Sequence, residues 1–296
     1  MSMRVTLLGT GDTTGTPTVG CDCATCVAAR ARGIERSRFS VHIENERTDE
    51  SILIDLSPDF RQQFLSQAVP LPDAAVVTHI HFDHLDGLGN AYRVFDELPV
   101  YAANEVDPKT GESVAETIRR KYEYLDRVSV FDVTPLASVE ICGLELTLVP
   151  VEHPPLLCFG LVVVDPETGA QLSLSGDTSY DIPADSREQL SDPDLFLADA
   201  IVSAALCDHH PLGGSHHDAD GVPRSFGTKH MTREGALALA DELEADVTRL
   251  VHTAHYYPAD EAFEEPLAVD GEQYRLDETG VTRLDTATTE SGATTE

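Results

Sequence analysis

Lysine is nearly absent from this chain of 296 residues, which has it only at Lys109, Lys121 and Lys229. Lysine and arginine together number 20 against 52 aspartates and glutamates, so the formal net charge is −32. Such a surface keeps a protein soluble but repels itself at low salt, a balance associated with halophiles. It also makes a nucleic-acid substrate unfavourable, because phosphate backbones are bound through lysine and arginine. We read the charge as adaptation to a salty cytoplasm.

Long apolar runs are also missing, which bears on membranes and export. No stretch of about 18 apolar residues occurs, so no segment resembles a transmembrane helix. The start, Met1 to Val5, leads directly into a strand-like run without the apolar region of a signal peptide. We therefore expect a cytoplasmic protein without a membrane partner.

Nothing in the sequence divides the chain into separate units. It has no linker rich in Pro, Gly and Ser and no internal repeat, and 41% of its residues are hydrophobic, enough for a full core. Strand-like and helix-like segments alternate, which predicts an α/β fold of two sheets flanked by helices. We expect one domain over residues 1–285. The remainder, residues 286–296, is rich in Thr, Glu and Ser and is predicted to be a disordered acidic tail.

The segment His79–His84 is the strongest chemical signal in the sequence. It follows an apolar strand-like run at residues 74–77 and precedes a helix-like segment at residues 85–95. Four of its six side chains are metal-ligand types: His79, His81, Asp83 and His84. Three imidazoles and one carboxylate suit zinc, iron or manganese better than calcium or magnesium. The segment therefore predicts a transition-metal site at a strand-to-helix turn.

Three further ligand-type residues follow later strand-like runs. His153 comes after the run at residues 144–149, and Asp177 after the run at residues 171–175. His252 directly follows the run Val247–Val251. A lone His or Asp at a strand end is more often a turn residue, but three of them after the first motif indicate one shared site.

This order of motifs resembles the metallo-β-lactamase superfamily, whose members are mostly dinuclear hydrolases with an αββα sandwich. The resemblance implies two active-site ions, zinc or manganese, and distributes the ligands between them. One ion would take His79, His81 and His153. The other would take Asp83, His84 and His252, with Asp177 bridging both. Two such ions, roughly 3.5–4 Å apart, activate water and polarise a phosphoryl or carbonyl oxygen, which predicts metal-assisted hydrolysis.

Three thiols near the N-terminus predict a second kind of metal site. Cys21, Cys23 and Cys26 lie within six residues, and in a cytosolic protein such clustering indicates metal binding rather than disulfides. A tetrahedral structural zinc needs a fourth ligand, for which His255 is the best candidate. The other cysteines, Cys142, Cys158 and Cys207, lie in apolar or mixed surroundings and are predicted to be core residues.

The cysteine cluster narrows the resemblance to the PhnP-type branch, which holds phosphoribosyl cyclic phosphodiesterases. The segments at residues 8–17 and 54–61 fit the same branch, as does Lys229-His230-Met231-Thr232. The resemblance implies a small, cyclic phosphodiester substrate. It also implies catalytic roles for Asp83, which is at the same time a metal ligand, and for His230. His230 would contact the phosphate and protonate the leaving group. The helix that follows is predicted to be capped by Thr232.

Several alternatives stay open. The polar stretch at residues 208–228 is a surface loop or a lid, and it carries His209, His210, His216 and His217. A tRNA 3′-end endonuclease of the ribonuclease Z type uses the same ligands but would need a basic surface. A cofactor-biosynthesis relative would use a single redox metal instead. The substrate, the metal in vivo and the oligomeric state, a homodimer included, are not set by the sequence.

Overall fold

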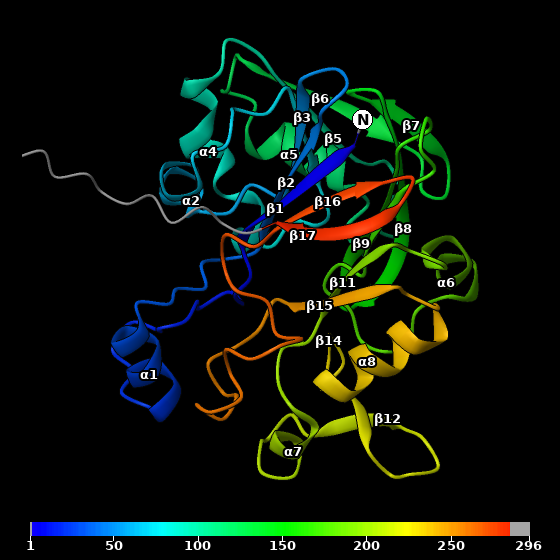
Figure 1. The fold of residues 1–296 in the computed structure, drawn as a ribbon. Helices are drawn as coiled ribbons and strands as arrows, with labels where there is room; N and C mark the ends of the chain where they lie inside the picture. Colours follow the sequence, from blue (N-terminus) through cyan, green and yellow to red (C-terminus); the bar gives the residue numbers. More distant parts are fainter. Residues whose placement is uncertain (1, 285–296) are drawn as a thin grey trace, which may run out of the picture.

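Two β-sheets packed face to face form the centre of the molecule (Figure 1), in a computed structural model that describes residues 2–284. The first sheet contains, in spatial order, β17 (Gly280–Leu284), β16 (Gln273–Asp277), β1 (Met3–Gly9), β2 (Ser40–Asn45), β3 (Glu50–Ile54), β4 (Ala74–Val77), β5 (Leu98–Ala103) and β6 (Val128–Val133). The second contains β15 (Val247–Val251), β11 (Leu195–Asp199), β10 (Gln171–Leu174), β9 (Leu156–Val164), β8 (Leu144–His153) and β7 (Ser138–Ile141). The predicted tail at residues 286–296 lies outside the described residues.

Helices cover the outer face of each sheet. On the first sheet, α2 (Phe60–Gln67) packs against β1, and α5 (Val114–Lys121) packs against β5 and β6. On the second sheet, α6 (Ala184–Leu190) packs against β8 and β9, and α8 (Arg233–Glu242) against β11 and β15. This order of layers confirms the predicted αββα sandwich. No helix among the described residues is long and apolar enough to cross a membrane.

The apolar residues of β11 show how the second sheet is buried on both faces. Leu195 and Leu197 belong to the core between the sheets, whereas Phe196 and Ala198 belong to the outer core under α8. A strand buried on both sides is apolar at every position rather than at alternate ones. Each fully buried side chain of this size contributes about 1.5–3 kcal/mol to the free energy of unfolding. The sheet ends that carry the polar residues are therefore supported by a well-packed core.

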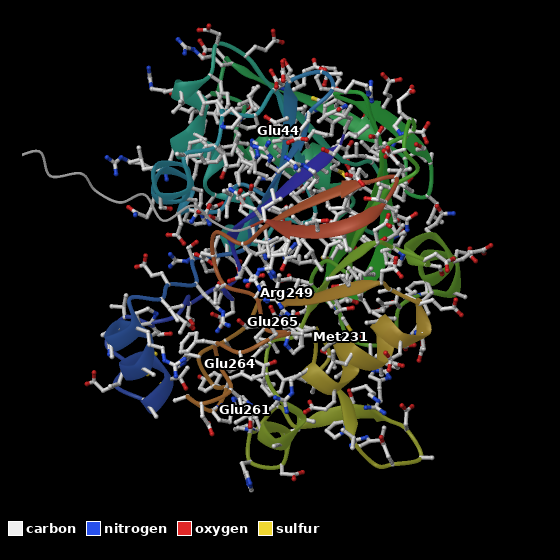
Figure 2. The ribbon with its side chains drawn as sticks, in the orientation of Figure 1. Glu44, Met231, Arg249, Glu261, Glu264 and Glu265 are labelled. Atoms are coloured by element: carbon white, nitrogen blue, oxygen red, sulfur yellow. The ribbon has the colours of Figure 1, made fainter. Side chains whose placement is uncertain are left out.

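A buried ion pair joins the two sheets. Arg249 of β15 donates from Nε and a terminal nitrogen to the Glu272 carboxylate beside β16, at 2.9 and 2.6 Å. Both side chains are at most 5% exposed, and Tyr274 also donates to Glu272 at 2.6 Å. Figure 2 shows Arg249 beside Glu265, a weaker partner at 3.5 Å. Removing either member of a desolvated, bidentate pair leaves an uncompensated charge, so this pair fixes how the sheets meet at the β15 end.

The prediction of one continuous helix over residues 85–95 is wrong. Instead, α3 (Phe82–Leu85) ends where the segment begins, and α4 (Leu88–Ala91) and a 3-10 helix at Tyr92–Val94 follow after a break. The break falls at Gly87, whose amide donates to the Leu56 carbonyl at 2.9 Å. A Cβ at Gly87 would lie 2.0 Å from the Ser57 carbonyl oxygen, so the chain approaches another backbone too closely for a continuous helix.

The histidine-rich segment is folded rather than open. After α7 (Ala204–Cys207) come β12 (Gly214–His217) and β13 (Pro223–Phe226), which form a three-stranded sheet with β14 (His230–Met231). In Figure 1, α7 and β12 lie beyond α8, away from the first sheet. This small sheet leads directly into α8, whose N-terminus is capped by the predicted residue, because the Thr232 hydroxyl accepts from the Gly235 amide at 3.0 Å.

Candidate metal centres and active site

Polar side chains gather where strands of both sheets end. β4 leads into His79 and β15 into His252, while β8 ends in His153 and β11 in Asp199. Asp177 follows β10 after a short turn. Since β10, β11 and β15 are parallel neighbours, their carboxyl ends meet at one edge of the sheet, the usual position of a binding site in such sheets.

One group of candidate ligands contains His79, His81, His153 and Asp177. A ligand atom from each lies within 4.8 Å of the others. Nδ1 of His81 is 3.0 Å from Nε2 of His79 and 3.2 Å from Nε2 of His153. Nitrogens bound to one tetrahedral zinc at about 2.0–2.1 Å are roughly 3.3 Å apart, so the three imidazoles are spaced to hold one ion.

A second group lies next to the first and shares Asp177 with it. Nε2 of His84 and Nε2 of His252 are each 3.3 Å from Oδ2 of Asp177 and 3.7 Å from Oδ2 of Asp83. The same Asp177 oxygen lies 3.8 Å from Nε2 of His79 in the first group. The side chain of Asp177 therefore stands between the two sets of nitrogens.

Two buried histidine nitrogens without hydrogen-bond partners indicate whether metal ions would fit this site. Nε2 of His84 and Nε2 of His252 are buried without any hydrogen-bond partner. A buried polar atom left in this state costs about 1–3 kcal/mol, which is offset if its lone pair binds a cation. The donor set of imidazoles and carboxylates is one that zinc and manganese accept. The residues present therefore fit a pair of divalent ions.

The pKa shifts of the charged side chains in this site also agree with metal binding. Burial alone would lower the pKa of His84, but the carboxylates of Asp177 and Asp55 raise it well above its usual range. Burial is likewise outweighed at His252, where Asp177 and Asp83 raise the pKa to about 9. For Asp83, the neighbouring imidazoles of His252 and His84 overcome burial and lower the pKa to about 2. Protons held by these imidazoles would leave on metal binding.

Asp55 supports the ligands from behind, and no local sequence pattern pointed to it. Its Oδ2 lies 2.6 Å from Nδ1 of His84, and its carboxylate accepts from the amide and hydroxyl of Thr78 at 2.8 Å each. The Thr78 hydroxyl lies 3.1 Å from Nδ1 of His79. A carboxylate on the far nitrogen of a ligand histidine fixes its tautomer and ring orientation.

His230 lies at the rim of the site and is held by Asp199. Nδ1 of His230 is 2.9 Å from Oδ2 of Asp199, and the other oxygen of that carboxylate is 3.7 Å from Nδ1 of His252. The His230 ring stacks on that of His252, with centroids 5.1 Å apart, and its side chain is 14% exposed. A ring nitrogen of His230 lies within 4.8 Å of ligand atoms of Asp177 and His252. The role of Asp199 was missed by sequence reasoning.

The four histidines of the segment at residues 208–228 lie outside the metal site. Among the described residues, none of His209, His210, His216 and His217 belongs to a metal-ligand group. His210 packs against Phe226, with ring centroids 4.9 Å apart, and the other three are exposed. The structure thus brings His230 to the metal site and leaves these four outside it.

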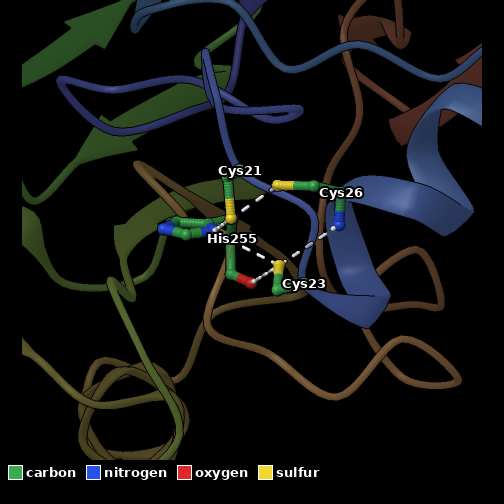
Figure 3. Close-up of side chains that lie close together, drawn as sticks. All are labelled: Cys21, Cys23, Cys26 and His255. Carbon is green, nitrogen blue, oxygen red and sulfur yellow. Dashed lines mark hydrogen bonds between the residues drawn. The ribbon is translucent and has the colours of Figure 1, made fainter.

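The three thiols and His255 converge on one point (Figure 3). Nδ1 of His255 is 3.4 Å from the sulfurs of Cys21 and Cys23 and 3.5 Å from that of Cys26. With Zn–S near 2.3 Å and Zn–N near 2.0–2.1 Å, a tetrahedral site separates sulfur and nitrogen by about 3.5 Å. The Cys26 amide and His255 overcome burial and lower the pKa of Cys23 to about 6. Free thiols in this arrangement fit a closed zinc site.

One short segment links this thiol cluster to the ligand groups around Asp177. His252 has φ of 54°, a left-handed conformation that costs a non-glycine residue about 1–3 kcal/mol. It is followed by Thr253, whose amide donates to the Thr10 carbonyl at 3.1 Å and whose carbonyl accepts from Asp12 at 3.2 Å. Two residues further on, His255 meets the thiols. The backbone that carries His252 is therefore fixed from both sides.

Comparison with known proteins supports this reading of the fold. A family described as Beta-lactamase superfamily domain matches residues 50–253. Among curated proteins, an octanoyltransferase of Porphyromonas gingivalis is 39% identical over 139 residues, which are 46% of this chain and 26% of the relative. The chain thus spans about a quarter of that protein's length.

Solved structures match the chain over nearly its whole length. A diphosphatase from the PhnP family has a TM-score of 0.73 and 26% identity, covering 96% of this chain and 99% of its own. Zinc-bound PqqB from Methylobacterium extorquens has a TM-score of 0.71 and 19% identity, covering 91% and 99%. The short form of human tRNase Z has a TM-score of 0.62 and 18% identity, covering 91% and 98%. The last two similarities concern the fold alone.

Proposed function

The chain belongs to the Beta-lactamase superfamily domain family, whose members are mostly metal-dependent hydrolases, and on that premise we propose that it is a dinuclear phosphodiesterase. Its substrate would be a small phosphodiester, such as a cyclic phosphate of phosphoribose. The observation that carries the proposal is the pair His230–Asp199 beside the shared carboxylate Asp177. This pair adds an acid to a site that already fits two ions.

The ligand residues would divide between the ions as their spacing indicates. His79, His81 and His153 would hold one, and Asp83, His84 and His252 the other, with Asp177 between them. Ions bound there would supply Lewis-acid polarisation of the phosphoryl group and a water activated near neutral pH. Asp55 would keep the His84 ring in the orientation that ligation requires.

His230 would act as the acid that protonates the leaving group. Because Asp199 accepts from Nδ1, the second ring nitrogen is free to face the substrate. In its protonated form it can donate a hydrogen bond to a phosphoryl oxygen and transfer the proton to the departing alkoxide. The Asp199 carboxylate holds the ring at the rim of the metal site.

The basic residues of this chain support a small substrate rather than a nucleic acid. The run Arg119-Arg120-Lys121 on α5 is the densest basic stretch, and each of its members is already paired with a carboxylate. Arg119 contacts Asp132 at 2.8 Å and Arg120 contacts Glu112 at 2.9 Å. Phosphate backbones need free cations along their path.

The acyl transfer named for the octanoyltransferase belongs to a protein matched over only 26% of its length, so we do not extend it to this chain.

A substrate screen at high salt tests the proposal. The purified protein, loaded with manganese or zinc, is assayed with 5-phosphoribosyl 1,2-cyclic phosphate and with bis(4-nitrophenyl) phosphate. Diphosphates, a tRNA precursor and a lactone serve as competing substrate classes. We expect hydrolysis of the two diesters with two active-site metal equivalents.

The other outcomes point to distinct functions. Preferential cleavage of the tRNA precursor would support an endonuclease, and preference for diphosphates would support the activity named for the PhnP-family relative. A single redox-active ion without hydrolysis would support a cofactor-biosynthesis role. Any of these three results would overturn the phosphodiesterase proposal.

A further inference from the structure

Lys229 is a basic residue beside the metal ligands, and the mechanism above gives it no role. It lies in the turn between β13 and β14, directly before His230. The Gly227 amide of this turn donates to the Gly213 carbonyl at 3.0 Å, and the Gly227 carbonyl accepts from the Ser215 hydroxyl at 3.0 Å. The turn that carries Lys229 is therefore held against β12.

The backbone of Lys229 is in direct contact with a metal ligand. Nδ1 of His153 donates to the Lys229 carbonyl at 2.9 Å, which leaves Nε2 of the same ring for an ion. The rings of His153 and His230 meet edge to face, with centroids 4.9 Å apart. Lys229 is thus next to both a ligand of the first group and the acid at the rim. Because these contacts are made by its backbone and by its neighbour, replacing its side chain leaves them in place.

The Lys229 ammonium has no carboxylate to neutralise it. Other cations of this region are paired, since Arg224 contacts Asp218 at 2.8 Å and Arg233 contacts Glu261 at 2.6 Å. Within residues 2–284, the Lys229 side chain forms no ion pair and no hydrogen bond, although the residue is only partly exposed. A partly buried charge without a partner is unfavourable, and a bound anion would offset that cost.

The charge of Lys229 acts on the open side of the first ligand group. Burial lowers the pKa of His81, and the positive charge of Lys229 adds to that shift. His81 is also the partly exposed member of its group, since the other three members are buried. The ammonium is therefore close to the face through which a substrate reaches the ligands.

The chemistry of this position favours an anionic oxygen of the substrate. An ammonium offers three donors and a full positive charge but no acceptor. It binds phosphate as a point charge, without the fixed geometry of a guanidinium. The protein as a whole has a net charge of −32, which repels an anionic substrate. A local cation beside the ligands offsets that repulsion.

We propose that Lys229 binds an anionic phosphate oxygen of the substrate at the entrance to the metal site. The inference rests on the proposed phosphodiesterase function and adds a binding residue to it. Such an oxygen can come from two sources: the phosphate held at the metal site, or a second phosphate of the same substrate. The experiment separates these two sources.

The experiment measures binding without turnover. Pentyl phosphate carries one phosphate, and 1,5-pentanediol bisphosphate carries two on the same carbon chain. Dissociation constants for both are measured by calorimetry with the manganese-loaded protein at high salt. Lys229→Gln should raise the dissociation constant of the bisphosphate about tenfold, as expected for loss of one charged hydrogen bond. An equal rise for pentyl phosphate assigns Lys229 to the phosphate at the metal site, and an unchanged value assigns it to the second phosphate.

Two further variants separate charge from structure. Lys229→Arg keeps the charge, so both dissociation constants should stay within about a factor of three of the wild type. Arg127→Gln is the matched control, because it removes one positive charge at the opposite edge of the first sheet. Arg127 precedes β6, whereas His79 follows β4, and these strands are parallel through β5. Metal content should match the wild type in all three variants.

The possible failures are distinguishable. The binding role is overturned if both dissociation constants are unchanged in Lys229→Gln, if they rise equally in Arg127→Gln, or if the wild type binds neither phosphate. Loss of metal from Lys229→Gln would likewise replace it with a structural role. Hydrolysis of bis(4-nitrophenyl) phosphate by the wild type reports on the function separately. Without that hydrolysis the phosphodiesterase proposal fails, while the two dissociation constants still decide the role of Lys229.

Discussion

Asp177 is the residue on which both groups of ligand nitrogens converge. Its Oδ2 lies 3.3 Å from Nε2 of His84 and of His252 and 3.8 Å from Nε2 of His79. Asp177→Ala should lower hydrolysis by roughly 10³-fold or more, because the ions would lose their shared ligand. Metal content by mass spectrometry and kcat with bis(4-nitrophenyl) phosphate check this. Asp181→Ala, an exposed carboxylate on the same turn, is the control, and full activity in metal-quantified Asp177→Ala would refute the assignment.

His230 should matter in proportion to how poorly the leaving group departs. His230→Ala removes the acid held by Asp199, so kcat should fall about 10²–10⁴-fold on a dialkyl phosphate. It should fall much less on a nitrophenyl ester, whose phenolate leaves without a proton. His217→Ala, an exposed histidine of the same segment, should change neither substrate. Equal losses on both substrates would leave His230 only a positioning role.

At the scale of elements, the segment after β15 connects the thiol cluster to the dinuclear site. His255 meets three sulfurs, and Thr25 donates from its hydroxyl to the Tyr257 carbonyl at 2.5 Å. Cys23→Ser should remove about one zinc equivalent and lower the melting temperature by several degrees, since metal binding here is part of the folding free energy. Thermal unfolding and zinc analysis of freshly purified protein check both effects.

The control for the thiol variant is another free cysteine. Cys142→Ser, remote from the cluster, should keep its zinc. Active-site metal affinity should also weaken in Cys23→Ser, because the backbone of His252 is anchored through Thr253 and His255. Zinc retained at the wild-type level, or a disulfide within the cluster in place of zinc, would contradict a structural zinc site.

At the scale of the whole molecule, the net charge of −32 dominates. Carboxylates outnumber lysines and arginines by 52 to 20. Raising potassium chloride from about 0.1 to about 2 M shortens the screening length from about 10 Å to under 3 Å. The melting temperature should therefore rise with salt, measured by circular dichroism. Osmotically matched sucrose is the control, and an equal rise in sucrose would show that charge screening is not the cause.

From the sequence alone, alternating strand-like and helix-like segments predicted two sheets flanked by helices, and the strand ends predicted where the ligands come together. A strand buried at every position, such as β4, is continuously apolar and carries its own signal. The strand-like runs at residues 74–77 and 247–251 became β4 and β15 with unchanged bounds. His79, Asp177 and His252 could be found because each follows such a run. The cysteine cluster was visible for a different reason, because three of its members are close in sequence.

Contacts between segments that are distant in sequence could be seen only in the folded chain. Asp55 lies 29 positions from His84, and Asp199 lies 31 positions from His230, so no local period marks either carboxylate as a partner. The break at Gly87 is set by the backbone of Ser57, which the helical pattern of residues 85–95 does not encode. Local patterns report the burial of one segment, whereas these features require two segments to meet.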